Sequence, residues 1–267
     1  SMFGNSFYHG TLRKYVIVFG NMFNGIYLQR LNQSDTVVQT LKVPIAYGPK
    51  EKFLVRLAQD PNLDQDVAIS LPRIGFEMMG ISYAANRKLT STQQNVSVSS
   101  TDTGALSTQY IPVPYDIQFR LSIFVKNADD GTQILEQILP YFQPEWTNNI
   151  KLIPGMDLTY DVPCILTDVS VQDAYEGDFS TRRTLMWDLN FTMKGYVFGP
   201  TSTNGIIKRA SIDAHADLPR SSPSERITVE PGLTSAGLPT SNSALSVPVQ
   251  EISADDDYGF ATNITDV

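Results

Sequence analysis

The residue types that do chemistry in enzymes are scarce in this chain of 267 residues. There are two histidines, His9 and His215, and one cysteine, Cys164. His9 lies near the expected start of a helix and His215 lies in a polar segment, which predicts neither a catalytic triad nor a metal site. Cys164 stands between Pro163 and Ile165 in an apolar strand pattern. Because reactive thiols need an exposed, electropositive setting, we interpret Cys164 as a buried, inert thiol.

Carboxylates gather in one segment that is followed by two arginines. These residues are Asp168, Asp173, Glu176, Asp178, Arg182 and Arg183. Paired carboxylates can hydrolyse glycosides or bind a hard cation through their oxygen atoms. The acids lie on and around an expected hairpin loop without the spacing of a calcium-binding loop, which favours solvated acids paired with nearby arginines. A salt bridge between subunits is the second interpretation.

The glycines show neither the phosphate-binding nor the dinucleotide-binding spacing. We therefore expect no catalytic residue, no metal ligand and no cofactor, and we predict that the chain is not an enzyme. A β-rich module that binds a carbohydrate or a cation through the acids of 168–178 is the alternative function. A hydrolase that uses Asp168 and Asp173 is the least favoured hypothesis.

The most distinctive segment, residues 114–146, ends in a cluster of aromatic residues and prolines. Its members are Pro140, Tyr141, Phe142, Pro144 and Trp146. Prolines fix the direction of the backbone, and Tyr and Trp are favoured anchors of protein interfaces. The cluster predicts either a partner or subunit interface or a cover for the core, and the residues leave both open. Tyr258 and Phe260 form a second apolar island that we expect to dock on a neighbouring subunit.

We expect both strands and helices to position this cluster. Residues 114–126 alternate, with Ile117, Phe119, Leu121, Ile123 and Val125 on one face, which predicts a strand. The helix that follows is expected to be capped by Asp129 or Asp130, to bury Ile134, Leu135, Ile138 and Leu139, and to end at Pro140. Other patterns predict a helix within 6–24 capped by Thr11, a short helix after Pro49, an extended pair over 66–85, and hairpins over 26–45 and 158–198.

These elements indicate an α+β fold, with a largely antiparallel sheet and a few packed helices. We expect the core to span residues 1–200, with a polar loop excursion at 86–110. Residues 201–267 are rich in Ser, Thr and Pro and show no hydrophobic periodicity, which predicts an extended acidic arm that orders only on assembly.

Composition excludes several functional classes. The net charge of −8 argues against a general nucleic-acid binder. A single cysteine excludes an intramolecular disulfide. No apolar run approaches the roughly 20 residues that span a bilayer, and the start lacks the pattern of a signal peptide, so we expect no membrane partner.

Several motifs resemble one family, in order along residues 2–200. They are Met2-Phe3-Gly4, Arg13-Lys14-Tyr15, and the stretches 43–51, 71–74, 121–124, 136–144 and 182–183. The run Glu-Gln-Ile-Leu-Pro-Tyr-Phe-Gln-Pro at 136–144 is the most specific of them. Together they are similar to the tail sheath stabilizer and completion proteins of T4-like contractile-tailed bacteriophages. Beyond residue 200 we find no such similarity.

The resemblance implies a fold like that of phage tail terminators and a structural role without catalytic residues. It implies a homo-hexameric ring in the virion, assembled in the host cytoplasm, that closes the head-proximal end of the tail. The partners would be sheath subunits, the tail-tube terminator and the neck or head-completion proteins. A lumen of negative charge would let DNA pass without specific binding, because phosphates are repelled there.

Overall fold

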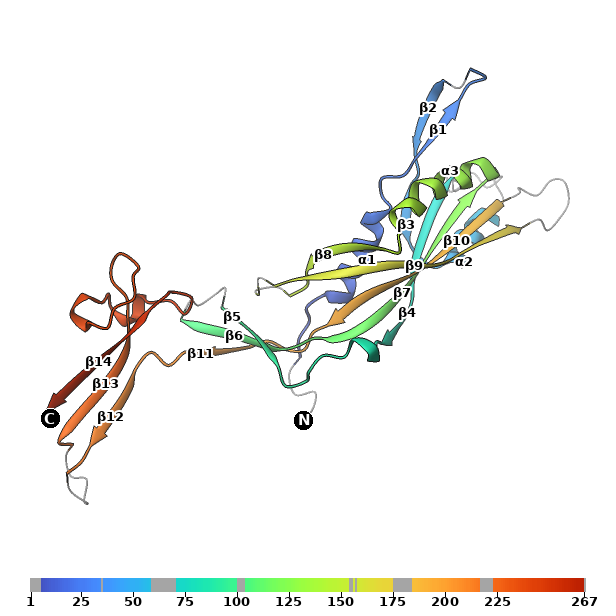
Figure 1. Cartoon of the computed structure of the whole chain (residues 1–267). Coiled ribbons are helices and arrows are strands. Elements are labelled where there is room, and N and C mark those ends of the chain that lie inside the picture. Colours follow the sequence, from blue (N-terminus) through green and yellow to red (C-terminus); the bar gives the residue numbers. More distant parts are fainter. Residues whose placement is uncertain are drawn as a thin grey trace.

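The computed structural model describes residues 6–34, 36–58, 71–99, 104–153, 156, 158–174, 184–216 and 223–266. The molecule is elongated (Figure 1). A body built on a large sheet carries a projecting hairpin, β1–β2, at one end. At the other end a narrow link leads to a separate small sheet that holds the C-terminus.

The body is organised around a six-stranded sheet with the order β3-β4-β7-β10-β9-β8. Its strands are β3 (Ile45–Tyr47), β4 (Arg73–Tyr83), β7 (Val113–Val125), β8 (Glu145–Lys151), β9 (Thr159–Ala174) and β10 (Thr184–Val197). All neighbours are antiparallel except β3 and β4, which are parallel. The prediction of an α+β protein with a largely antiparallel sheet is therefore confirmed.

The centre of the sheet is the strand that the alternation predicts. β7 pairs with β10 from Val125 opposite Leu185 to Val113 opposite Val197. The five apolar residues on its predicted face are all buried, and they are Ile117, Phe119, Leu121, Ile123 and Val125. The predicted hairpin over 158–198 is also present, as β9 and β10. Cross-strand pairs of this kind stabilise a sheet, so the longest strands hold the body together.

Helices cover both faces of this sheet. α1 (Thr11–Met22) and α3 (Ala128–Ile138) share the main hydrophobic core with β7, β9 and β10. α2 (Lys50–Ala58) packs on the opposite face, where Phe53 meets Phe124 and Met186. A Cβ added at Gly131 of α3 would lie 2.3 Å from Nε1 of Trp187 on β10. Glycine at this position therefore lets α3 approach the sheet closely.

The helix starts differ from the predicted ones. α1 is preceded by Gly10, which has a positive φ of 65°, and Thr11 is its first residue. α3 is preceded by Asn127. Asp129 and Asp130 lie within its first turn, where carboxylates interact favourably with the helix dipole. The predictions of Thr11, Asp129 and Asp130 as caps are wrong. Asp130 is buried because Arg30 of the hairpin pairs with it.

The hydroxyl of Tyr15 fixes α1 to the sheet. It donates to the carbonyl oxygen of Tyr196 at 2.8 Å and accepts from the backbone N–H of the same residue at 2.7 Å. Tyr15 is fully buried, and its burial raises the pKa of the phenol well above the usual value. Both backbone groups lie near the end of β10, so one side chain satisfies two polar groups that the core would otherwise isolate.

The predicted hairpin near the N-terminus is formed by β1 (Tyr27–Leu31) and β2 (Val37–Lys42). Two glutamines of α3 bind the outer edge of β1. The Gln133 amide accepts from the N–H of Gln29 and donates to its carbonyl, and the Gln137 amide does the same for Tyr27. The Arg30–Asp130 ion pair adds a third contact. The hairpin is thus joined to α3 along one edge, while its tip projects from the body (Figure 1).

The link between the two parts contains three short strands, ordered β11-β6-β5. They are β5 (Gln94–Val98), β6 (Ala105–Tyr110) and β11 (Ser202–Gly205). The expectation of a loop over 86–110 is therefore wrong for the two strands it contains. The alternating pattern of β6, in which Ala105, Ser107 and Gln109 are buried, lacks large apolar residues and so hides a strand in a polar sequence.

The C-terminal part is a three-stranded antiparallel sheet, ordered β12-β13-β14. Its strands are β12 (Ala210–Ala214), β13 (Glu225–Gly232) and β14 (Gly259–Asp266). A strap over 233–258 connects β13 and β14, and includes the short 3₁₀ turns η3 (Ser243–Leu245) and η4 (Val249–Glu251). Cβ atoms added at Gly232 and Gly259 would lie 2.2 and 2.8 Å from the carbonyl oxygen of Thr240, so both glycines admit the strap. The expected absence of regular structure beyond residue 201 is wrong for these strands.

Candidate interaction surfaces

A large groove lies where the ends of α1 and α3 approach β8. Its volume is about 840 Å³. The residues that shape it include Met22, Phe23, Ile138, Tyr141, Phe142 and Trp146. Pro140, in the 3₁₀ turn η2 (Leu139–Tyr141) that follows α3, also lines it. All members of the predicted aromatic cluster except Pro144 therefore line this groove.

The aromatic residues of this cluster have two different settings. Phe142 packs on Phe191 and Phe23, at ring-centroid distances of 5.2 and 6.2 Å, and so covers the core. Tyr141 and Trp146 meet edge to face at 5.7 Å and are 61% and 42% exposed. Apolar rings held in place but left in solvent are typical of contact surfaces. Phe142 thus covers the core, whereas an interface stays a prediction for Tyr141 and Trp146.

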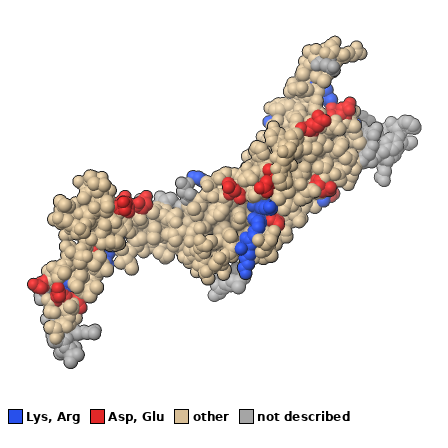
Figure 2. All heavy atoms as spheres, viewed as in Figure 1, with Lys and Arg blue, Asp and Glu red and all other residues tan. Residues whose placement is uncertain are grey.

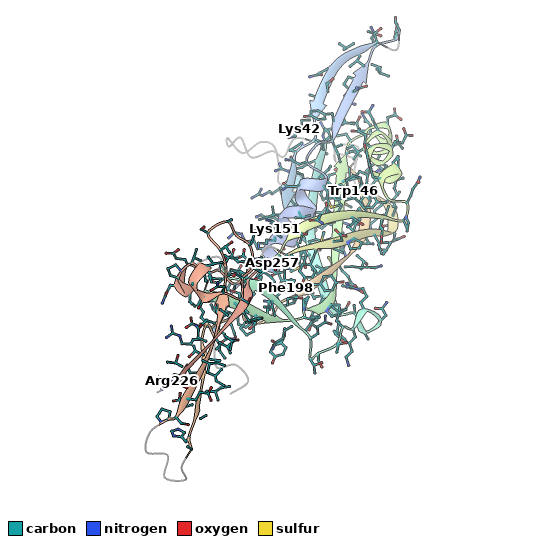
Figure 3. The ribbon with its side chains drawn as sticks, turned by 60° about the vertical axis from the view of Figure 1, so that its left-hand side comes forward. Lys42, Trp146, Lys151, Phe198, Arg226 and Asp257 are labelled. Carbon is teal, nitrogen blue, oxygen red and sulfur yellow. The ribbon has the colours of Figure 1, made fainter. Side chains whose placement is uncertain are left out.

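The helix that was predicted to end at Pro140 is shorter than expected. Leu139 is exposed rather than buried with Ile138, because α3 ends at Ile138 and the chain continues as the turn η2. Pro144 is exposed and precedes β8. Trp146 donates from Nε1 to Oδ1 of Asn148 at 3.3 Å, along the same face of the strand. Figure 3 shows Trp146 and Lys151 on this strand, far from Arg226 of the C-terminal sheet.

A second apolar surface lies on the C-terminal sheet. Ile212, Ile227 and Ile264 are directly opposite one another across its three strands and so share one face. Ile212 and Ile264 are 60% and 63% exposed. Phe260 lies on the same face, exposed, with its ring 5.9 Å from that of Tyr258. We call this surface the isoleucine face. Sequence reasoning found Tyr258 and Phe260 but missed the isoleucines, because strand register is needed to bring them together.

The opposite face of the C-terminal sheet is polar or covered. Asp213 and Arg226 form an exposed ion pair there, in which the hydrogen bond from Arg226 lowers the pKa of Asp213. Ser243 of the strap bonds Asn263 of β14 at 3.0 Å. The strap contacts this side of the sheet through Ser243. Its residues Ile252 and Ser253 border Phe260 at one end of the isoleucine face. Ile212 and Ile264 stay exposed.

The segment that suggested acid chemistry is only partly described. Asp168 is exposed on β9, opposite Asn190 of β10, and Asp173 lies opposite Leu185. Glu176, Asp178, Arg182 and Arg183 fall outside the described residues. Within the described ranges, no three His, Cys, Asp or Glu side chains are grouped as metal ligands.

The remaining reactive residue types have structural settings. Burial raises the pKa of the Cys164 thiol to about 12, as expected for an inert thiol in the core. Nε2 of His9 donates to the carbonyl oxygen of Gly199 at 2.8 Å, close to the end of the body. Both residues are thereby committed to packing or backbone contacts.

A buried polar network on the α2 side was not expected from sequence. Lys50 pairs with Asp188 of β10, and the hydroxyl of Ser122 donates to the other carboxylate oxygen at 2.6 Å. Lys50 also reaches Gln172 of β9 at 3.0 Å. These contacts tie the start of α2 to three strands. Most of the face shown in Figure 2 is neutral, as the low content of charged residues predicts.

Comparison with known proteins decides the family. The model of the T4-like virus Myoviridae tail sheath stabiliser family matches residues 6–262. The tail completion protein gp15 of Enterobacteria phage T4 is 35% identical over 229 residues, which cover 82% of each chain. This chain belongs to the T4-like tail sheath stabiliser family.

The family match corrects one expectation and confirms another. The match extends to residue 262, so the C-terminal sheet belongs to the tail sheath stabiliser region. The motifs that carry the resemblance in the sequence analysis end near residue 200, so that limit was too early. The resemblance to tail sheath stabilisers is confirmed. The family is a structural one, a component of the phage tail and hence of the virion. Among the described helices, none is long and apolar enough to cross a membrane.

Proposed function

We propose that this tail sheath stabiliser forms a homo-hexameric ring that caps and completes the head-proximal end of a contractile tail. The family match over residues 6–262 is the observation that supports this proposal most strongly. A ring closes by heterologous contacts, so each copy needs two different complementary surfaces. The exposed rings of Tyr141 and Trp146 on the body provide one such surface.

In this proposal the apolar surfaces of the body and of the C-terminal sheet serve different partners. Tyr141 and Trp146, on the body, contact neighbouring copies within the ring. The isoleucine face, carried beyond the body by the link, contacts sheath subunits and holds the last sheath ring in place. Exposed apolar patches on a module of this size favour protein contacts over solvent. Arg182 and Arg183 remain candidates for a salt bridge between subunits.

The proposed ring joins the tail to the head. One of its sides rests on the tail-tube terminator, and the other presents a surface to the neck and head-completion proteins. The net charge of −8 repels phosphates, which lets DNA cross the lumen without specific binding. No catalytic step and no cofactor enters this role.

Electron microscopy and a sheath-binding assay test the proposal together. The full chain, alone or added to tails that lack it, should form six-fold rings at the head-proximal end. Ile264→Asp should weaken association with sheath roughly tenfold or more, because a carboxylate would be buried against an apolar partner. Thr265→Asp, one residue along on the opposite face, is the matched control and should bind normally. A chain that forms no ring and never binds sheath would refute the proposal.

A further inference from the structure

Residues 77–83, the C-terminal part of β4, form a sheet edge that no described strand pairs. β3 pairs with β4 over Ile74–Phe76 alone. Residues 77–83 pair with β7 on one side, and no described strand covers the other. Their sequence, Glu-Met-Met-Gly-Ile-Ser-Tyr, contains neither lysine nor proline, the residues that usually protect an edge from strand addition. An apolar edge of this kind needs a partner strand to avoid unspecific pairing.

A bulge in β4 turns two apolar side chains to the helix-covered face of the sheet. The register shifts between Met78 and Gly80, after which Ile81 lies opposite Ile117 and Tyr83 opposite Tyr115. Ile117 points into the core beside α1, so Ile81 shares its face. Ile81 and Tyr83 are nevertheless 41% and 48% exposed. A bulge can change the direction in which side chains point, and here the side chains of Ile81 and Tyr83 point toward solvent.

The opposite edge of the same sheet is β8, which borders the groove. Trp146, Asn148 and Ile150 lie opposite Cys164, Val162 and Tyr160 of β9, and so they face the helices. Beyond β8 the described residues supply no further strand. Its open edge therefore runs beside a hollow that is walled by Tyr141 and Trp146 on the face where Ile81 and Tyr83 project.

The strand directions allow these two edges to join in a ring. Every step from β4 through β7, β10 and β9 to β8 is antiparallel, so β4 and β8 run in the same direction. Rotation about a ring axis that runs along the strands keeps both the strand direction and the outward-facing side of the sheet. Thus β4 of one copy can lie parallel to β8 of the next, with both helix-covered faces on the same side. Pairing β4 with another β4 would instead reverse direction and end in a dimer.

We propose that a second copy of this chain occupies the groove, by adding the last residues of its β4, 80–83, to the first residues of β8, 145–148. Ile81 and Tyr83 then enter the hollow beside Tyr141 and Trp146. Backbone hydrogen bonds between the edges supply affinity, and the two side chains in the hollow supply specificity, as in other cases of strand addition. This joint rests on the proposed function in that it supplies the contact that closes the ring.

Cysteine cross-linking tests the joint directly. Ser82 and Thr147 are exposed and project on the other face of their strands, outside the groove. The doubly substituted chain, Ser82→Cys with Thr147→Cys, is assembled into tails and treated with a short bismaleimide. We expect a ladder of covalent oligomers. The two positions lie at opposite edges of one sheet, so a link within one chain is excluded. Cys164 is buried and stays unmodified.

The single variants are the controls for pairing between unlike edges. Neither Ser82→Cys nor Thr147→Cys alone should give cross-linked dimers. Dimers of Ser82→Cys would show that like edges pair, and would overturn the proposal. Absence of the ladder in tails that contain the double variant would overturn it too. Tails that never take up even the unsubstituted chain would instead refute the proposed function, so the two failures are distinguishable.

An edge-protecting variant gives a second readout. Ile81→Lys places a charge on the open edge, and we expect association between copies to weaken roughly thirtyfold or more. Val38→Lys, an exposed valine on β2, is the matched control and should assemble like the unsubstituted chain. Circular dichroism melting of both variants reports folding. Normal rings from a folded Ile81→Lys chain would overturn the joint.

Discussion

The two sheets of this protein bury their residues very differently. The six-stranded sheet has α1 and α3 on one face and α2 on part of the other, and its central residues have no contact with solvent. The three-stranded C-terminal sheet leaves Ile212, Phe260 and Ile264 of its isoleucine face exposed. The first sheet buries its faces within one chain and leaves open only its edges at β4 and β8. The second leaves apolar surface exposed, and burial of such surface against a partner supplies free energy of binding.

Their polar contacts differ in the same way. In the body, the Tyr15 hydroxyl and the Lys50–Asp188 pair are buried, so losing one partner strands the other away from water. On the C-terminal sheet, the Arg226–Asp213 and Arg209–Glu230 pairs are solvent-exposed, at least in part. Exposed ion pairs contribute little to stability because water and salt screen them. Substitutions should therefore affect folding in the body and association in the C-terminal sheet.

The largest expected effect comes from replacing aromatic rings in the two sheets. Phe119→Ala removes a buried ring stacked on Phe19 at 4.4 Å and should lower the free energy of unfolding by about 3–5 kcal/mol. Phe260→Ala removes a ring from the isoleucine face and should change it by less than about 1 kcal/mol. Urea titrations of both variants make the comparison. Equal losses would contradict the difference between the sheets.

An intermediate effect is expected at Tyr15. Tyr15→Phe leaves the backbone N–H and carbonyl of Tyr196 without their partner and should cost about 1–3 kcal/mol at neutral pH. Because the folded-state pKa is raised, the native phenol keeps its proton above pH 10.0 while the unfolded phenol loses it. The stability that Tyr15 supplies is thus present below pH 10.0 and declines as pH rises further.

Urea midpoints of Tyr15→Phe and the unsubstituted chain, measured at neutral and alkaline pH, check this sign. The gap between them should narrow at alkaline pH. Tyr110→Phe, at an exposed tyrosine, is the control and should match the unsubstituted chain at both pH values. A gap that widens with pH would show that the phenol ionises more readily in the folded state.

Much of the body could be predicted from sequence because its signals are local. β7 and the hairpin of β9 and β10 follow from strict alternation, and α3 follows from Ile134, Leu135 and Ile138 at helical spacing. The helix caps were harder to predict from sequence. Asp130 has a residue type that is typical of caps, but its carboxylate binds Arg30, which lies a hundred positions away in the chain. The strands of the link could not be predicted from sequence because small and polar residues occupy their buried positions.

The candidate surfaces depended more on distant contacts. The groove joins segments near residues 22, 138 and 146, so no single stretch of sequence reveals it. Tyr141 and Trp146 were found because proline and aromatic residues cluster locally. The isoleucine face was missed because Ile212 and Ile264 are adjacent only through Ile227 of the strand between them. Residue types predict that a surface exists, whereas register decides which residues share it.

The smallest expected effect is at an ion pair of the C-terminal sheet. Arg226→Ala removes an exposed ion pair on the polar face of the C-terminal sheet, and we expect no measurable shift of the urea midpoint. Sheath association should also be unchanged, because the pair lies opposite the isoleucine face. A clear loss of stability would mean that this small sheet depends on charge pairing, contrary to the contrast drawn between the two sheets.

The contacts of Gln133 and Gln137 with β1 have a mechanical consequence. Each amide holds both backbone groups of one strand residue, so α3 takes the place that another strand would occupy beside the hairpin. The hairpin is therefore held to the body along β1 as well as at its base. This connection continues through α3 into the turn that carries Tyr141. A load on the hairpin tip therefore reaches the wall of the groove through four hydrogen bonds and one helix.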